Sequence, residues 1–202
     1  MLHYHAVPVT VRAVLQALAP PLLATGFSLA GGTSLALRCG HRRSMDLDFF
    51  TTENFDAEEL LRQLELPRES VVDRAAGTLR LLWQGVQIDF LRHAYPLLEE
   101  PVTLDGIRML SLADVAAMKL NAITNRGSKK DFFDLAMLLE RRTLPELLEA
   151  CCRKYSASNK FMVIRSLAWF DDAEAEPDPE SLTNLSWPAV KATISAALAS
   201  LT

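Results

Sequence analysis

The stretch that decides the fold is Gly31-Gly32-Thr33-Ser34, followed closely by Met45-Asp46-Leu47-Asp48-Phe49-Phe50. The second segment alternates acidic and apolar residues, and side chains two apart in a strand share a face. Asp46 and Asp48 should therefore point together, with their apolar neighbours turned into a core. The two glycines form a turn that opens a helix, whose unpaired backbone amides attract anions. Together the segments predict a site for phosphate groups and a divalent metal ion.

A third acid, Asp89, lies at the centre of the strand-like segment 86–91. If this strand lies beside that of Asp48, three carboxylates face one groove. Each unneutralised contact at roughly 4 Å would then cost on the order of 4 kcal/mol at an effective dielectric of about 20. Hard oxygen ligands suit Mg²⁺ or Mn²⁺, which would remove that cost. The alternative is structural: Asp46 and Asp48 could cap an edge strand, and Asp89 could be an exposed residue of an amphipathic strand.

Composition agrees with a soluble globular protein. The chain has 202 residues, of which 50% are apolar and 23% charged. Its three cysteines show no CxxC spacing, so neither a disulfide framework nor a zinc site is indicated. A net charge of -4 argues against a basic surface for indiscriminate nucleic-acid binding. The sequence shows no signal peptide and no membrane-spanning segment, so we expect a cytoplasmic protein that makes no membrane contact.

The order of predicted elements indicates an α+β fold, with a mixed sheet and helices first and a C-terminal helical bundle after it. Hydrophobic spacing predicts helices at 11–18, 33–38 and 56–65, and strands at 27–30, 46–50, 70–73, 79–83 and 86–91. The last two strands are joined by a tight turn at residues 84–85. Helices follow residue 111. We expect a core domain at 1–108 and a helical domain at 109–202, with an acidic segment at about 171–186 that is a solvated linker rather than a partner-binding tail.

Several motifs together resemble a known family. They are Gly31-Gly32-Thr33-Ser34-Leu35-Ala36-Leu37, then Gly40-His41-Arg42-x-Ser44-x-Asp46-Leu47-Asp48-Phe49-Phe50, the strand acid Asp89, and downstream Lys119, Arg126 and Lys130-Asp131-x-x-Asp134-Leu135. This pattern resembles the AbiEii/AbiGii toxin-type nucleotidyltransferases, within the superfamily that has the polymerase-beta-like core. The similarity covers roughly residues 25 to 140, and the combination is far more specific than any single motif.

The resemblance implies roles for individual residues. Asp46 and Asp48 would bind the metal, and Asp89 would assist metal binding or activate the acceptor hydroxyl. Lys119 and Asp131 would complete the catalytic set, although Asp131 also suits a capping box from Ser128 and Lys119 could reach solvent instead. The nucleotide would be held by the glycine turn and by hydroxyl and cationic groups, namely Gly31, Gly32, Thr33, Ser34, Arg42, Ser44, Lys119, Arg126 and Lys130. Asp134 would support Asp131 or Lys119, or be a surface acid.

The implied reaction is transfer of a nucleoside monophosphate from a nucleoside triphosphate to an acceptor, with tRNA or another RNA as the acceptor. The resemblance also implies the toxin of a type IV toxin–antitoxin or abortive-infection system, with a cognate antitoxin. Two alternatives stay open at this point. The acceptor could be a small hydroxylated molecule such as an aminoglycoside, or the chain could be a nucleotide-binding module without turnover.

Overall fold

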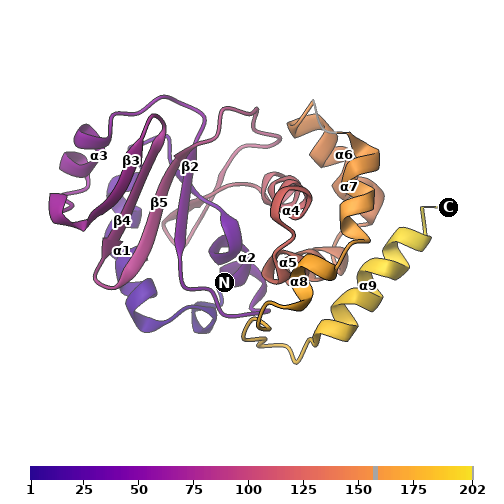
Figure 1. The fold of residues 1–202 in the computed structure, drawn as a ribbon. Coiled ribbons are helices and arrows are strands. Elements are labelled where there is room, and N and C mark those ends of the chain that lie inside the picture. The colour runs from indigo at the N-terminus through magenta and orange to yellow at the C-terminus, as the bar shows by residue number, and fades with distance from the viewer. Residues whose placement is uncertain (157–158, 202) are drawn as a thin grey trace.

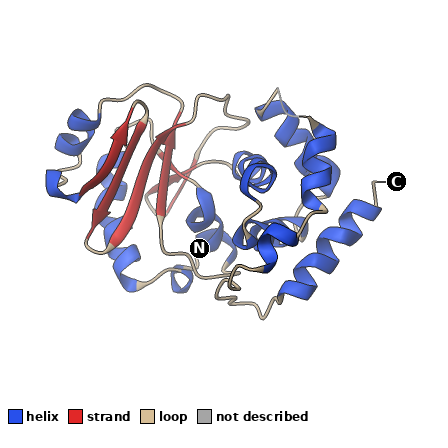
Figure 2. Ribbon diagram, viewed as in Figure 1, coloured by secondary structure: helices blue, strands red, loops and turns tan. Residues whose placement is uncertain are grey.

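The computed structural model describes residues 1–156 and 159–201, and their fold is a mixed sheet flanked by helices (Figures 1 and 2). Within this described part, a seven-stranded sheet has the order β3-β4-β5-β2-β1-β7-β6. Its strands are β1 (Ser28–Leu29), β2 (Leu47–Thr51), β3 (Val71–Ala75), β4 (Thr78–Trp83), β5 (Val86–Arg92), β6 (Val102–Leu104) and β7 (Ile107–Met109). The N-terminal helices are α1 (Val9–Leu22), α2 (Gly31–Cys39) and α3 (Ala57–Gln63), with short 3₁₀ turns at Tyr4–Ala6 and Arg68–Ser70. The later helices are α4 (Leu112–Arg126), α5 (Lys129–Leu139), α6 (Leu144–Lys154), α7 (Lys160–Leu167), α8 (Asp171–Glu174) and α9 (Trp187–Ala199). The predicted α+β class is confirmed.

The centre of the sheet places the predicted acids side by side. Strands β2 and β5 pair in parallel, with Asp48 directly opposite Asp89. Burial along β2 alternates, so that Leu47 and Phe49 are buried while Asp48 is only partly covered. The alternation predicted from the sequence therefore turns the acids away from the hydrophobic core.

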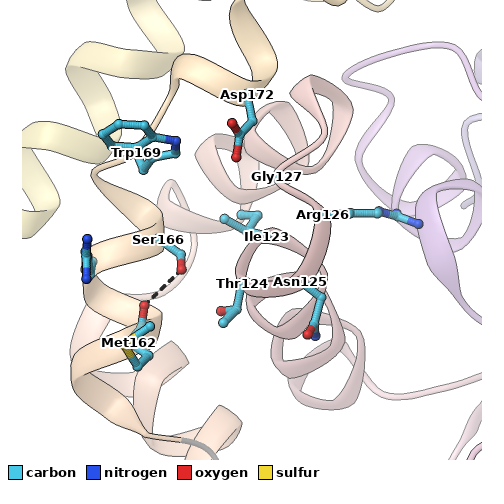
Figure 3. A pocket seen from close by; sticks show the side chains of 10 residues that line it. Ile123, Thr124, Asn125, Arg126, Gly127, Met162, Ser166, Trp169 and Asp172 are labelled. Carbon is cyan, nitrogen blue, oxygen red and sulfur yellow. Dashed lines mark hydrogen bonds between the residues drawn. The ribbon is translucent and has the colours of Figure 1, made fainter.

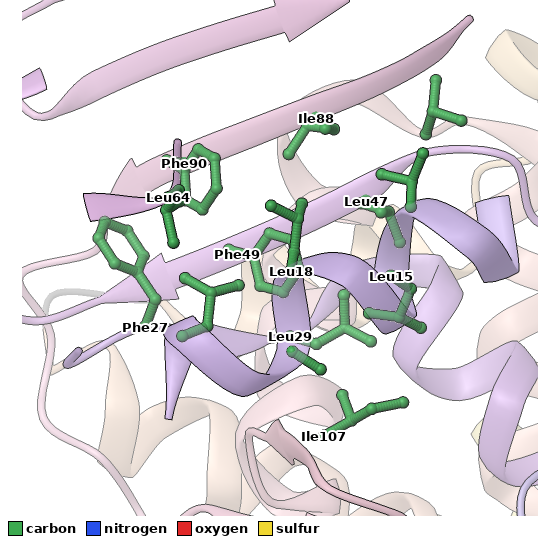
Figure 4. Close-up of a cluster of buried hydrophobic side chains, with 14 of the residues drawn as sticks. Leu15, Leu18, Phe27, Leu29, Leu47, Phe49, Leu64, Ile88, Phe90 and Ile107 are labelled. Carbon is green, nitrogen blue, oxygen red and sulfur yellow. The ribbon is translucent and has the colours of Figure 1, made fainter. Parts of the chain in front are cut away.

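The core behind the acids lies between the sheet and the N-terminal helices. Figure 4 shows Leu15 and Leu18 of α1 among side chains from the strands, including Phe49 and Phe90. Rings of Phe49 and Phe90 stack with centroids 5.2 Å apart. Burying each such ring against neighbours contributes on the order of 2 kcal/mol, so this layer holds β2 and β5 in register.

The other half of the molecule is helical and shares its core with α2. Its buried cluster is built from α4 to α9 and also takes in Ala30 and Leu35, which come from the N-terminal half. Trp187 of α9 packs between Phe132 and Phe170, with centroids 5.7 Å from each. Helix α2 thus contacts both cores and fixes the sheet against the helices. No helix in the described residues has the length and apolar character needed to cross a membrane.

Three helices begin at a polar residue that caps the first turn. Asp56 caps α3 by accepting a bond from Glu59 N at 2.8 Å. Ser111 caps α4 through Asp114 N, and a capping box opens α6 at Thr143. Helix α2 differs, because it begins at Gly31 rather than at residue 33. Both glycines are consequently part of its first turn.

The β6–β7 hairpin was not predicted from the sequence. Its strands are three residues long, too short for a periodic pattern, although Asp105-Gly106 is a strong hairpin-turn signal. Strand β7 pairs in parallel with β1. The domain boundary expected at residue 108 therefore falls inside a strand of the sheet.

The acidic segment is largely exposed, as expected of a solvated segment, but bonds to remote residues fix it against the rest of the protein. It contains the short helix α8. Residues 174–182, here called the acidic strap, bond to remote segments at both ends, through the Glu174 carbonyl and through Leu182 N. Glu176 accepts from Ser128 Oγ and Lys129 N at 2.8 and 2.7 Å, and Asp178 accepts from Lys129 Nζ at 3.0 Å. Composition alone does not reveal such pairing, because the partners are remote in sequence.

Candidate functional site

A cleft of about 800 Å³ lies between the sheet and the helical half. Most of the site residues predicted from the sequence line it: Gly31, Gly32, Arg42, Ser44, Asp46, Asp48, Asp89, Lys119, Arg126 and Lys130. The remaining three, Thr33, Ser34 and Asp131, are fully buried and do not line it. The fold thus gathers residues from Gly31 to Lys130 into one groove.

Two of the acids that line this cleft, Asp48 and Asp89, have raised pKa values. Burial raises the pKa of Asp48 above its usual value, with Lys119 opposing and Asp89 adding to the rise. Burial likewise raises the pKa of Asp89, and Arg80 opposes it. Among the described residues no set of three or more His, Cys, Asp or Glu side chains is arranged as a complete metal site. The expected three-carboxylate cluster is therefore not preformed.

The donor set still suits a hard divalent ion. Asp89 Oδ1 is buried and has no hydrogen-bond partner within the described structure, so it is a carboxylate oxygen available for a cation or a proton. Mg²⁺ usually takes one or two carboxylates and completes its octahedron with waters and substrate phosphates. Asp46 and Asp48 provide such a pair.

The glycines are needed because site side chains lie against the turn. Gly31 has a φ of +62°, and a Cβ there would lie 2.2 Å from Asp48 Oδ2. A Cβ on Gly32 would lie 2.4 Å from Arg42 Nη2. The turn therefore lets Asp48 and Arg42 approach the start of α2.

The predicted contacts of Thr33 and Ser34 with a nucleotide need correction. Thr33 Oγ1 is hydrogen bonded to the Asp46 carbonyl and lies 2.8 Å from Ser44 Oγ. Ser34 Oγ is buried without a partner among the described residues. Helix α2 starts at Gly31, two residues earlier than expected, and in this helix both hydroxyl side chains are buried. Thr33 fastens α2 to the loop that carries the acids.

Asp134 holds the cationic wall of the cleft. Its carboxylate accepts from Arg42 Nε and Nη2 at 2.7 and 2.8 Å, and it lies 2.6 Å from Lys119 Nζ. His41 Nε2 is 2.7 Å away. Burial by itself raises the pKa of Asp134, but Lys119 and Arg42 outweigh it and hold that pKa well below its usual value. Asp134 is thus a buried anion that positions two cations, and the surface-acid interpretation was wrong.

Asp131 has the same kind of role. It lies 2.9 Å from Lys119 Nζ, and Arg126 Nε donates to it at 2.8 Å. Its side chain is fully buried and makes no capping bond to Ser128, which excludes the capping-box alternative. Lys119 is 5% exposed and lines the cleft. Of the two predicted catalytic residues on these helices, only Lys119 reaches the groove, and Asp131 holds it there.

Arg80 is a cleft residue that the sequence interpretation missed. It lies opposite Asp89 across the β4–β5 hairpin, with Nε 3.5 Å from Asp89 Oδ2. The signal was present, because residues equidistant from the tight turn at 84–85 face each other in the hairpin. Half of the Arg80 side chain is exposed. It is therefore free to reach toward a ligand beside Asp89.

A second hollow of about 280 Å³ lies between α4 and α7 (Figure 3). Its lining includes Met162, Trp169 and Asp172. In Figure 3 Arg126 points from α4 away from these side chains, and its guanidinium bonds to Asp131. Apart from Arg126, none of the predicted site residues lines this hollow, so the chemistry belongs to the larger cleft.

Comparison with known proteins decides the family. The model of the nucleotidyl transferase AbiEii toxin family, Type IV TA system, matches residues 13–81 and 84–200. This chain belongs to the AbiEii toxin family. The match spans both the sheet and the helical half, which extends the resemblance well beyond residue 140.

Individual proteins are also similar to this chain in sequence or in fold. An uncharacterized protein from Aquifex aeolicus (strain VF5) is 40% identical over 157 residues, which cover 74% of this chain and 76% of that protein. JHP933 from Helicobacter pylori has a similar fold, with a TM-score of 0.63 at 15% identity over 100% of this chain and 93% of that one. MenT4, a nucleotidyltransferase toxin from Mycobacterium tuberculosis H37Rv, gives a TM-score of 0.63 at 18% identity over 94% of this chain and 82% of that one. At these identities the structures show that the AbiEii-family chain has the same fold.

Proposed function

We propose that this AbiEii-family protein transfers a nucleoside monophosphate from a nucleoside triphosphate to an RNA, with tRNA as the acceptor, in a reaction that depends on a divalent metal ion. The observation that carries the proposal is the register of Asp48 beside Asp89 at a cleft that also holds the glycine turn, Lys119 and Arg126. Carboxylates and phosphate-binding groups in one groove suit phosphoryl chemistry, where positioning and electrostatics contribute most.

The bonds that form and break in this transfer indicate what the residues of the cleft would do. An acceptor hydroxyl oxygen forms a bond to the α-phosphorus, and the bond from that phosphorus to the bridging oxygen of pyrophosphate breaks. The hydroxyl proton passes to Asp89, whose raised pKa makes it a better base than an ordinary carboxylate. Asp46 and Asp48 would hold Mg²⁺ or Mn²⁺, which supplies charge neutralisation for the triphosphate.

The cationic wall would hold the leaving group. Lys119 and Arg42 are locked by Asp134, and Arg126 is locked by Asp131, so their charges are placed before substrate arrives. Lys130 is exposed at the same cleft, and Ser44 adds a hydroxyl. Preorganised donors of this kind stabilise charge that develops on pyrophosphate without further rearrangement.

Family membership supports a toxin role, with a cognate antitoxin as the protein partner and the cytoplasm as the site of action. The test is to incubate the protein with Mg²⁺ and each labelled nucleoside triphosphate, offering tRNA, tRNA-depleted RNA and aminoglycosides separately. We expect label in the tRNA pool and none with Asp48→Asn. The matched control is Asp73→Asn, an exposed acid on β3, which should transfer normally.

Two other outcomes would identify a different function. Label only in the aminoglycoside pool would establish small-molecule modification instead. Binding of a triphosphate without label in any pool and without pyrophosphate release would establish a non-catalytic module.

A further inference from the structure

One end of the cleft differs in chemistry from the rest. Around Lys119, Arg126 and Lys130 the lining is cationic, but toward the carboxyl ends of β2 and β5 it becomes aromatic and apolar. This aromatic end consists of Phe50, Leu91, His93, Val115, Met118 and Tyr155. The groove therefore changes from charged to apolar along its length.

The rings at this end form a packed edge-to-face cluster. The His93 ring lies 5.7 Å from the rings of Phe50 and Tyr155, at interplanar angles of 82° and 80°. His93 Nε2 is 3.0 Å from the Tyr155 hydroxyl. Burial, aided by Lys154, lowers the pKa of His93 to about 4, so the imidazole is neutral at physiological pH.

Lys154 lies near these rings but is not available to an anion at this end. Lys154 is 1% exposed and donates to Asp114 Oδ1 at 2.6 Å and to the Pro96 carbonyl at 2.9 Å. A phosphate placed here would lose water without gaining the Lys154 ammonium as a partner. A flat, uncharged, polarisable group suits the site, because aromatic rings favour offset or edge contacts with such groups.

We propose that the aromatic end binds the nucleobase of the nucleoside triphosphate. Phe50 follows Asp48 by two residues on the same face of β2, which places it roughly 7 Å further along the strand. A ribose spans such a distance between an α-phosphate at the acids and a base at the rings. Met118 of α4 forms the opposite wall, and the neutral imidazole of His93 offers a polar contact to a base edge. This inference rests on the proposed function, since it places the donor nucleotide.

The test separates base from phosphate by using two ligands. Binding of α,β-methylene nucleoside triphosphates and of inorganic tripolyphosphate, both with Mg²⁺, is measured by calorimetry on the full chain. Phe50→Ala and Met118→Ala should weaken nucleotide binding roughly 5- to 150-fold, as for loss of a stacked base. Their affinity for tripolyphosphate should stay within about twofold of the wild type. Leu82→Ala is the control, because Leu82 is exposed on β4 and does not line the cleft.

Two results would overturn the inference. Equal losses for nucleotide and tripolyphosphate would mean that the rings only support the fold. Unchanged nucleotide affinity in both variants, even with a raised KM for RNA, would place the base elsewhere. Failure of the proposed function looks different, because the wild type would then bind nucleotide with the same dependence on Phe50 yet transfer nothing to any acceptor.

Discussion

Replacing Asp134 by asparagine should destabilise the protein strongly, because this buried carboxylate holds two buried cations. The Asp134 side chain is 0% exposed and contacts Arg42 at 2.7 and 2.8 Å and Lys119 at 2.6 Å. Removing one partner of a buried ion pair costs about 3–5 kcal/mol, since the other charge stays desolvated. Asp131 still contacts Lys119 in the variant and offsets part of this loss. We expect Asp134→Asn to lower the free energy of unfolding by about 3 kcal/mol.

The matched control is Glu58→Gln, an acid that also contacts two cations but at the surface. Glu58 lies 2.7 and 2.6 Å from Arg68 and Arg74, whose side chains are 82% and 62% exposed. Exposed pairs contribute about 0–1 kcal/mol each, so this variant should stay close to the wild type. Urea unfolding followed by tryptophan fluorescence measures both values by linear extrapolation.

The pH dependence of the Asp134 effect has a defined sign. The pKa of Asp134 is well below its usual value in the folded chain, so its contribution is complete above the unfolded value of about 3.9 and is lost as the pH falls further. The difference in free energy of unfolding between the wild type and Asp134→Asn should therefore be constant from about pH 5 to 8 and become smaller at lower pH. A loss below about 1 kcal/mol at pH 7, or one equal to that of Glu58→Gln, would refute the role of Asp134 as the organising anion.

Three further predictions address the metal, the glycine turn and the aromatic end. Asp48→Asn should be at least as stable as the wild type in EDTA, because burial raises the pKa of Asp48 and disfavours its charged form. Mg²⁺ should stabilise the wild type by about 2.7 kcal/mol at 100 times Kd, and calorimetry should show that the variant lacks this gain in stability. The same gain in both proteins would argue against this metal site. Gly31→Ala should lose more stability than Gly106→Ala in thermal melts, because only at Gly31 would a Cβ meet a carboxylate, at 2.2 Å. Both glycines have a positive φ, and the backbone strain of alanine at either position costs about 1–3 kcal/mol. Equal losses would show that the contact with Asp48 does not matter. Burial and Lys154 lower the pKa of His93 to about 4, so as the pH falls the imidazole takes up a proton in the unfolded chain before it does so in the folded one, and the free energy of unfolding should fall from about pH 6.5 to 4. His93→Gln should remove about 1–2 kcal/mol of that fall, after allowance for partial exposure of the ring. An unchanged pH slope in urea titrations would contradict the neutral imidazole.

The sequence alone determined the class of fold and the residue types of the site. Alternation in β2 and β5 predicted which faces Asp48 and Asp89 occupy, since the side-chain period of a strand is two. Local signals also determined the starts of α3, α4 and α6, because a capping residue acts within one turn. The family pattern added Lys119, which lines the cleft as expected.

Only the tertiary structure decided which charged groups meet. That Asp134 holds Arg42 and Lys119 depends on how α5 packs against α2 and α4, and no local pattern encodes a contact across ninety residues. The acidic strap is the same case, because its composition is that of a solvated linker while its partners come from the start of α5 and the loop before β2. Secondary structure follows from short-range sterics and periodicity, whereas the pairing of buried charges follows from packing, which brings remote segments together and removes the water that would otherwise screen them.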